Sequence, residues 1–83
     1  MYIVYILQSL KNGRYYVGHT EDVSVRLKRH NAGLVRSTKS FIPWEMIYTE
    51  RYNTRSEAYR REVEIKKYKG GIKFKKMLGY WKD

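Results

Sequence analysis

The sequence contains no cysteine, and this absence excludes three kinds of chemistry at once. A disulfide framework, a thiolate zinc site and a cysteine nucleophile all need the sulfur atom. Proline occurs only once. No apolar run reaches the length of about 18 residues that a membrane-spanning helix needs, and the apolar amino-terminal segment lacks the flanks of a signal peptide. We therefore expect a cytoplasmic protein that has no membrane partner.

Acidic residues are also few, because eight Asp and Glu stand against eighteen Lys and Arg. The formal net charge is +10 and the isoelectric point is near 9.9. A small protein with this charge is expected to meet a polyanion. Nucleic acid is the leading candidate for that partner.

What the sequence does have is enough apolar material for one small folded domain. Hydrophobic residues make up 42% of the chain, and the aromatic set comprises nine Tyr, two Trp and two Phe. This composition is typical of a globular domain and not of a disordered segment. With 83 residues the chain leaves no room for a second domain, so we expect a single domain over residues 1–83.

The chain predicts six elements in the order β-β-α-β-α-α. Apolar runs predict the strands, and an Asn-Gly turn at Asn12 and Gly13 joins the first two. Thr20 is the expected N-cap of the first helix, and Thr54 with Glu57 forms a capping box for the second. The predicted ranges are strands 2–7, 15–19 and 43–49 and helices 21–32, 55–69 and 72–78, with a loop over 34–42. This order predicts an α+β fold, a small three-stranded, mainly antiparallel sheet flanked by helices.

The first helix places two polar side chains on or beside the stripe that should be apolar. At 100° per residue, His30 shares a stripe with Val23 and Leu27, and Arg26 lies at its edge. A core histidine with satisfied hydrogen bonds and a snorkelling arginine would explain either residue alone. Four residues apart on one helix, the two together also indicate a site.

The second helix shows the same conflict, because Glu62 shares a stripe with Ala58 and Ile65. A buried carboxylate must be paired, protonated or bound to a metal. A structural ion pair with Arg26 is the simplest alternative to a metal site. A zinc site built from His19, His30 and Glu62 is a further alternative, but these residues lack a standard ligand spacing.

The hairpin should also bring Tyr5 and Tyr16 together. Two phenols, a guanidinium, an imidazole and one carboxylate on a basic domain suit phosphodiester cleavage. The carboxylate can hold a divalent metal, the guanidinium can stabilise charge on phosphorus, and a phenol or imidazole can relay a water proton.

Six pieces of the sequence, in order, resemble the GIY-YIG nuclease domain, and they cover nearly the whole chain. The likeness is nearest to small stand-alone bacterial members, which are similar to the amino-terminal domain of an excinuclease. Ile3 replaces the glycine of the family's first motif, and the asparagine that several members carry after the second helix has no clear counterpart. The pieces are Ile3-Val4-Tyr5, Tyr16-Val17-Gly18, Asp22-x-x-x-Arg26-x-x-x-His30-Asn31, Thr38, Pro43-Trp44 and Glu62-x-x-Ile65-Lys66.

This resemblance implies DNA phosphodiester hydrolysis with one Mg²⁺ or Mn²⁺ ion. It implies that Glu62 holds the metal and that Arg26 neutralises the transition state. The same resemblance gives Tyr5, helped by Tyr16 and His30, the task of orienting and deprotonating the attacking water. A free tyrosine is only about 0.1% ionised at pH 7, so cationic neighbours should lower its pKa. Arg26 and Lys11, which lies between the two motifs, are the candidates.

Basic side chains outside this set are expected to contact phosphates, and binding should weaken as salt rises. The expected substrate is DNA, branched or damaged, cut with little sequence specificity in repair or recombination; RNA and the oligomeric state stay open. A non-catalytic nucleic-acid-binding module on the same fold is the main alternative, and a small RNA-binding protein with base-stacking aromatics is another. The expected phosphate contacts are Lys28, Arg29, Arg36, Lys39, Lys66 and Lys73.

Overall fold

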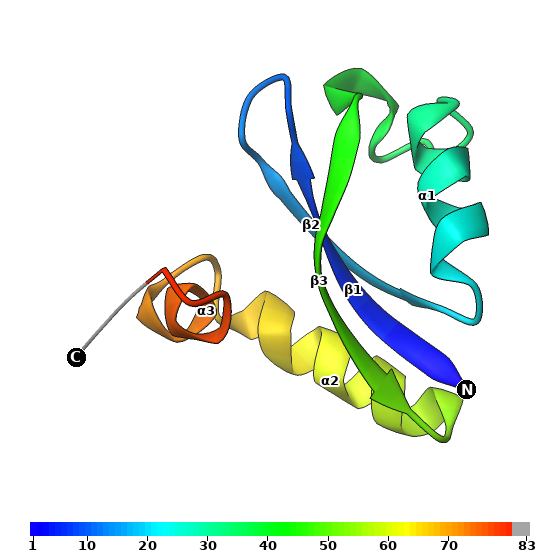
Figure 1. The fold of residues 1–83 in the computed structure, drawn as a ribbon. Coiled ribbons are helices and arrows are strands. Elements are labelled where there is room, and N and C mark those ends of the chain that lie inside the picture. The colour runs from blue at the N-terminus through cyan, green and yellow to red at the C-terminus, as the bar shows by residue number, and fades with distance from the viewer. Residues whose placement is uncertain (81–83) are drawn as a thin grey trace.

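Strand β1 (Tyr2–Ser9) is the middle of a three-stranded antiparallel sheet. A computed structural model describes residues 1–80, and in it β2 (Tyr15–Thr20) pairs with one edge of β1 and β3 (Trp44–Tyr52) with the other (Figure 1). The apolar run that predicted β1 is buried, since Val4, Ile6 and Leu7 are 0% exposed. A strand covered on both faces reads as such a run in the sequence.

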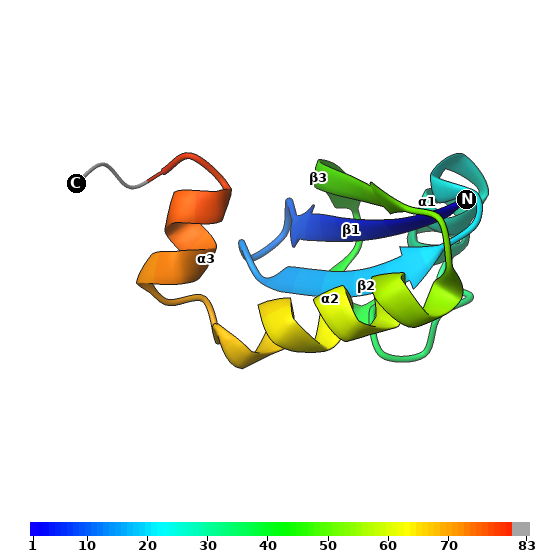
Figure 2. The ribbon, with the colours of Figure 1, turned by 90° about the horizontal axis from the view of Figure 1, so that it is seen from below.

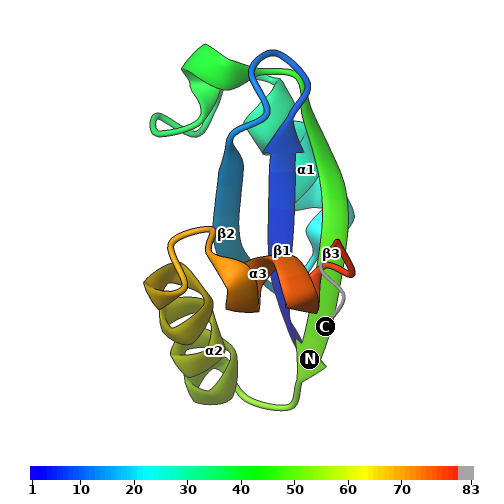
Figure 3. The ribbon, with the colours of Figure 1, turned by 90° about the vertical axis from the view of Figure 1, so that its left-hand side faces the viewer.

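Helices cover both faces of this sheet. Helix α1 (Val23–Asn31) lies on one face, while α2 (Arg55–Lys67) and α3 (Ile72–Met77) lie on the other (Figures 2 and 3). The predicted α+β fold and its element order are confirmed. Within residues 1–80, none of the helices has the length and apolar character that crossing a membrane requires.

The alternation of side chains along β1 builds two separate hydrophobic cores. One core lies under α2 and α3 and the other under α1. Each fully buried aliphatic or aromatic side chain contributes about 1.5–3 kcal/mol, so both cores are needed in so short a chain. The first contains Val4, Ile6, Val17, Ala58, Ile65 and Phe74, and the second contains Tyr5, Leu7 and Trp44.

Helix α1 begins two residues later than predicted, because its N-cap is Asp22 and not Thr20. The Asp22 carboxylate accepts hydrogen bonds from the backbone N–H groups of Ser24 and Val25. The Thr20 hydroxyl instead accepts the backbone N–H of Asp22. At its other end, the Asn31 side chain accepts the N–H of Trp44 at 2.6 Å and donates to its carbonyl at 3.0 Å. This pair of bonds fixes α1 against β3.

The predicted capping box of α2 is present, but the helix ends at Lys67 and not at residue 69. Tyr68 is the C-cap, and Lys69 already has a left-handed backbone with φ of 51°. Smaller differences occur elsewhere. Strands β1, β2 and β3 extend beyond their predicted ends, α3 ends one residue earlier, and the predicted loop contains a short 3₁₀ helix, η1 (Lys39–Phe41).

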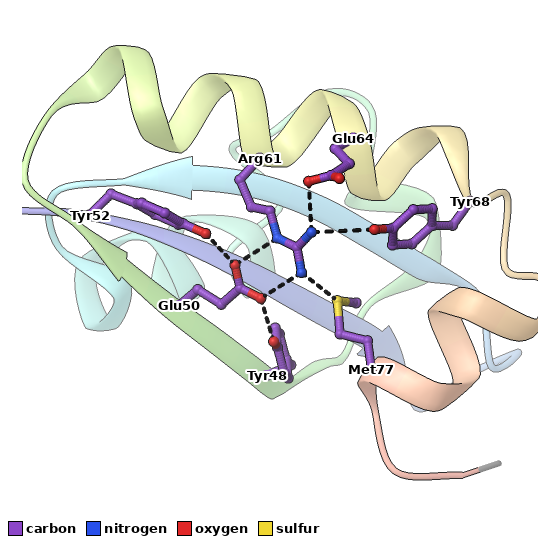
Figure 4. Close-up of polar contacts among 7 residues, drawn as sticks. All are labelled: Tyr48, Glu50, Tyr52, Arg61, Glu64, Tyr68 and Met77. Carbon is purple, nitrogen blue, oxygen red and sulfur yellow. Dashed lines mark hydrogen bonds and ion pairs between the residues drawn. The ribbon is translucent and has the colours of Figure 1, made fainter. Parts of the chain in front are cut away.

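An ion pair between Arg61 and Glu50 joins α2 to β3 (Figure 4). The guanidinium donates to both carboxylate oxygens, at 2.8 and 3.0 Å, and the hydroxyls of Tyr48 and Tyr52 donate to the same carboxylate. Burial alone raises the pKa of Glu50, but the hydrogen bonds from Arg61 and the two tyrosines outweigh it and lower the pKa to about 2. Arg61 also reaches the Met77 sulfur, so the network includes α3.

This network predicts that the fold loses stability in acid. Glu50 has a pKa of about 2 in the folded chain against 4.5 for the free group, so its ionised form favours folding above pH 4.5. About 3 kcal/mol should be lost as the pH falls from 4.5 to 2. Urea unfolding followed by circular dichroism across this range measures it. The substitution Glu50→Gln should remove this loss, while Glu64→Gln, at the exposed acid that Arg61 also contacts, should keep it. An unchanged pH dependence in Glu50→Gln would refute the assignment.

Candidate active site

The Tyr5 hydroxyl lies where three elements meet. Tyr5 is 1% exposed, and its ring is 6.3 Å from that of Tyr16 and 5.8 Å from that of His30, centroid to centroid. Gly18, opposite Tyr5 on β2, permits this placement. A Cβ atom at Gly18 would lie 2.7 Å from the Tyr5 hydroxyl oxygen, which no side chain could tolerate without a shift. The glycine is therefore needed for close approach and not for an unusual backbone angle.

His30 is fully buried, and both of its ring nitrogens are hydrogen-bonded. Nε2 lies 2.9 Å from the Tyr5 hydroxyl oxygen, and Nδ1 lies 2.8 Å from Oγ1 of Thr38. The Thr38 hydroxyl donates its own proton to the carbonyl of Val35, so it accepts from His30 Nδ1–H. Nε2 then carries the lone pair and accepts the proton of the Tyr5 hydroxyl. His30 is thus both a satisfied core histidine and the partner of the candidate tyrosine.

The pKa values correct the expectation that cationic neighbours make Tyr5 easy to ionise. Burial raises the pKa of Tyr5 to about 12, although the hydrogen bond from Arg26 works in the opposite direction. Burial, together with the charges of Arg26 and Arg29, lowers the pKa of His30 to about 4. At neutral pH, Tyr5 is therefore a phenol that donates to a neutral imidazole.

Of the two cations proposed to act on Tyr5, only Arg26 contacts it. Its Nε donates to the Tyr5 hydroxyl oxygen at 3.4 Å, and this bond raises the pKa of Arg26. Lys11 turns elsewhere, because its Nζ donates to the backbone carbonyl of Ser40 at 3.2 Å. We call Tyr5, Tyr16, Arg26 and His30 the tyrosine cluster.

Glu62 is buried and paired, but not with Arg26. One carboxylate oxygen lies 2.7 Å from Nδ1 of His19, and the other accepts from Nζ of Lys66 at 2.7 Å. The alternative of a structural ion pair between Arg26 and Glu62 is therefore wrong, because strand alternation turns His19 toward α2 while Arg26 comes from α1 on the opposite face. The charge of Glu62 is one cause of the raised pKa of Tyr5, so the two clusters influence each other. We call His19, Glu62 and Lys66 the glutamate cluster.

An open polar cleft of about 450 Å³ links the two clusters. His19 of the glutamate cluster and Arg26 of the tyrosine cluster both line it, and Arg55 adds a second guanidinium. The cleft is large enough for a phosphate group. Sequence reasoning missed Arg55, while the alternation of β2 could have placed His19, which shares a face with Val17. The remaining lining residues are Tyr2, Thr20 and Glu21.

The residues present fit a single divalent cation bound mainly by substrate and water. Mg²⁺ is commonly held by one or two carboxylates together with phosphate oxygens. Glu62 is the carboxylate of the site that could serve as such a ligand, and a metal would have to displace His19 or Lys66 from at least one of its oxygens. No group of three or more acidic or histidine ligands occurs within residues 1–80. The zinc alternative also fails on geometry, because both nitrogens of His30 bind Tyr5 and Thr38.

The six basic residues expected to contact phosphates are exposed, but they do not form one patch. Lys28 and Arg29 lie on α1, and Arg36 and Lys39 lie in the segment between α1 and β3. Lys66 on α2 pairs with Glu62, and Lys73 on α3 lies 5.9 Å from the centre of the Tyr68 ring. Their positions on opposite faces of the sheet indicate that one straight duplex could not contact all six.

The chain is similar to known proteins over most of its length. A family model described as the GIY-YIG catalytic domain matches residues 1–76. Two relatives, UPF0213 proteins of Staphylococcus aureus strains Mu3 and N315, are each 41% identical over 68 residues, covering 81% of this chain and 82% of theirs. The solution NMR structure of a UPF0213 protein from Bacillus halodurans is 32% identical, with a TM-score of 0.48 over 89% of this chain and 92% of that one. Since the family match spans both the tyrosine and the glutamate clusters, the chain belongs to the GIY-YIG family.

Proposed function

We propose that this protein is a metal-dependent endonuclease that hydrolyses phosphodiester bonds in DNA. The observation that carries the proposal is the convergence of His30 and Arg26 on the hydroxyl oxygen of Tyr5. Membership of the GIY-YIG family supports phosphodiester hydrolysis as the class of reaction. The net charge of +10 supports a polyanionic substrate.

The polar cleft would receive the scissile phosphate. Arg26 and Arg55 both line it, and a guanidinium presents paired N–H donors that match phosphate oxygens. Arg26 is also bonded to Tyr5, so a phosphate on Arg26 would lie beside the phenol. This arrangement would stabilise the charge that develops on the phosphate oxygens in the transition state.

Tyr5 would act as a relay and not as a preformed base. As the attacking water gives a proton to the Tyr5 oxygen, the phenol passes its own proton to Nε2 of His30, 2.9 Å away. No free phenolate is then required, which agrees with a pKa of about 12. A phosphate on Arg26 would also offset the positive field that lowers the pKa of His30, and so make the imidazole a better acceptor.

Glu62 is the residue that would hold the divalent metal. When bound, Mg²⁺ or Mn²⁺ supplies Lewis-acid stabilisation of a non-bridging phosphate oxygen. Lys66 would have to leave one oxygen of Glu62, and its ammonium would then be available to the substrate backbone. We further propose that cleavage shows little sequence specificity and serves repair or recombination on branched or damaged DNA. The cytoplasmic location stays a prediction.

A second candidate function is nucleic-acid binding without cleavage. One observation favours it: both oxygens of Glu62 are engaged, by His19 and by Lys66. If these ion pairs persist in the complex, no metal can reach the carboxylate. The two functions differ in whether the chain breaks DNA.

The decisive test is cleavage of plasmid and branched DNA by Glu62→Gln. The substitution keeps the size of the side chain and removes the charge that would hold the metal, so nicking with Mg²⁺ or Mn²⁺ should fall at least about 100-fold. Glu64→Gln, on the same helix but 56% exposed, should cut like the wild type. EDTA should stop both. Salt-sensitive binding without any nicking by the wild type would instead favour the binding module.

Tyr5→Phe tests the relay. The ring stays and only the hydroxyl that joins Arg26 to His30 is lost, so the cleavage rate should fall about 10²- to 10⁴-fold. The matched control is Tyr80→Phe, at a tyrosine that is 59% exposed, and it should leave the rate unchanged. Gel-based nicking under single-turnover conditions gives the rates, and circular dichroism checks that both variants fold. A Tyr5→Phe protein that cuts as fast as the wild type would exclude Tyr5 from the chemistry.

The protonation state of His30 is a separate prediction. Because its pKa is lowered to about 4, the imidazole should stay neutral down to about pH 5, with the proton on Nδ1 and the lone pair on Nε2. Nitrogen-15 NMR of the imidazole rings distinguishes the two tautomers and the charged form. An imidazole that becomes charged near pH 6.5, or one with its proton on Nε2, would contradict the proposed relay.

A further inference from the structure

A second cavity is lined by residues of β2, α2, α3 and the segment that joins the two helices. Figure 3 shows this segment next to β2. The cavity has a volume of about 380 Å³, and we call it the aromatic groove. The proposed mechanism does not use this cavity, although Tyr16 and Lys66 of the two clusters are among its lining residues. Its walls are mainly apolar, with two lysines among them: the principal lining residues are Tyr15, Val17, Ile65, Lys66, Lys69 and Phe74.

The groove offers an aromatic ring that is held in place yet open. Tyr15 is 40% exposed, and its ring packs edge-on with that of Phe74, with centroids 4.9 Å apart and planes at 67°. Phe74 itself is 3% exposed and belongs to the core. The core therefore fixes the position of Tyr15 and leaves part of its ring available for contact with a flat ligand.

Charge at the groove points to an anionic ligand. Lys66 and Lys69 both line it, and no acidic residue does. Lys66 is paired with Glu62, so Lys69 is the cation that a ligand in the groove would meet. Lys69 adopts a left-handed backbone and is followed by Gly70, which also lines the cavity. The reversal of the chain at these residues brings Lys69 to the groove beside Lys66, one turn back on α2.

The groove adjoins the glutamate cluster of the candidate active site. Tyr16 lines it and belongs to the tyrosine cluster, and Lys66 lines it and contacts Glu62. A ligand that contacts Lys66 in the groove would thus lie one helical turn along α2 from Glu62, the candidate metal ligand. A nucleotide combines the features that the groove matches: a flat apolar base that stacks on aromatic rings, joined to phosphates that bind lysine.

We propose that the aromatic groove binds an unpaired nucleobase of the substrate, beside the glutamate cluster. A base stacked and paired within a duplex cannot enter, so the groove gives the chain a preference for flaps, bulges, loops or single-stranded ends. The proposal rests on the proposed function in taking nucleic acid as the substrate. It does not need cleavage to occur, because base binding depends on Tyr15 and Lys69, which lie outside the catalytic set.

Fluorescence of 2-aminopurine tests the groove directly. The full chain is titrated, in EDTA and without cleavage, into a deoxythymidine decamer that carries one 2-aminopurine, and stacking on Tyr15 should quench the signal. Tyr15→Leu keeps an apolar contact to Phe74 but removes the ring, so affinity should fall about tenfold. Tyr80→Leu, at an exposed tyrosine outside the groove, should bind within about twofold of the wild type. A ribonucleotide decamer should be quenched as well, because the groove reads the base.

A pair of lysine variants gives a second measurement if Tyr15→Leu is poorly folded. Lys69→Gln should weaken binding and lower the salt dependence by about one counterion, whereas Lys67→Gln, whose residue lines a different cavity, should not. A fully paired duplex with the same base should bind wild type and Tyr15→Leu equally.

Several outcomes would overturn the proposal. Equal affinity of Tyr15→Leu and wild type for the single strand would do so. A Tyr15→Leu variant that loses as much affinity for the duplex as for the single strand would do so as well. A doubling of mass at high concentration that Tyr15→Leu abolishes would assign the groove to a second copy of the chain. Failure of the two proposals is distinguishable: quenching without any nicking removes the nuclease and keeps the groove, and nicking with unchanged affinity in Tyr15→Leu does the reverse.

Discussion

The burial of β1 on both faces is the constraint on which the rest of the structure depends. Alternation along the strand sends Val4 and Ile6 to one core and Tyr5 and Leu7 to the other. The candidate catalytic tyrosine is therefore a core residue, held by packing and not by a loop. Its hydroxyl is positioned by the pairing of β1 with β2, since Gly18 lies directly opposite. A side chain fixed in this way pre-organises a site at little entropic cost.

Helix α2 holds both edges of the sheet through two neighbouring residues. Arg61 reaches Glu50 on β3, while Glu62 reaches His19 on β2. Adjacent residues on a helix point about 100° apart, so one helix can contact β3 with Arg61 and β2 with Glu62. The same helix therefore supplies a stabilising ion pair and the candidate metal ligand, and its docking determines how far the carboxylate lies from the tyrosine cluster.

The helices and strands could be predicted well because caps, turns and apolar runs depend on neighbouring residues in the sequence. The capping box at Thr54 and Glu57 fixes the start of α2 whatever surrounds it. The start of α1 was predicted wrongly because two residues compete for the N-cap position. Thr20 and Asp22 are both good N-caps, and the structure uses Asp22. Buried stripes also identified His30 and Glu62 before any partner was known. The partners could not be read in the same way, because they depend on which face of the sheet each helix covers. A pKa could not be inferred from charge alone either, since burial outweighs Arg26 at Tyr5.

The pairing of Glu62 with His19 and Lys66 allows the chain to fold without a metal ion. Lys66 and His19 come from the chain itself, and each lies 2.7 Å from a carboxylate oxygen. The chain thus carries its own counterions for a charge that it buries, so it can fold before any metal arrives. A chelator is therefore expected to leave the chain folded, unlike small domains whose folding free energy comes from metal binding. For the proposed nuclease, metal supply would then govern when the chain acts and not whether it stays folded.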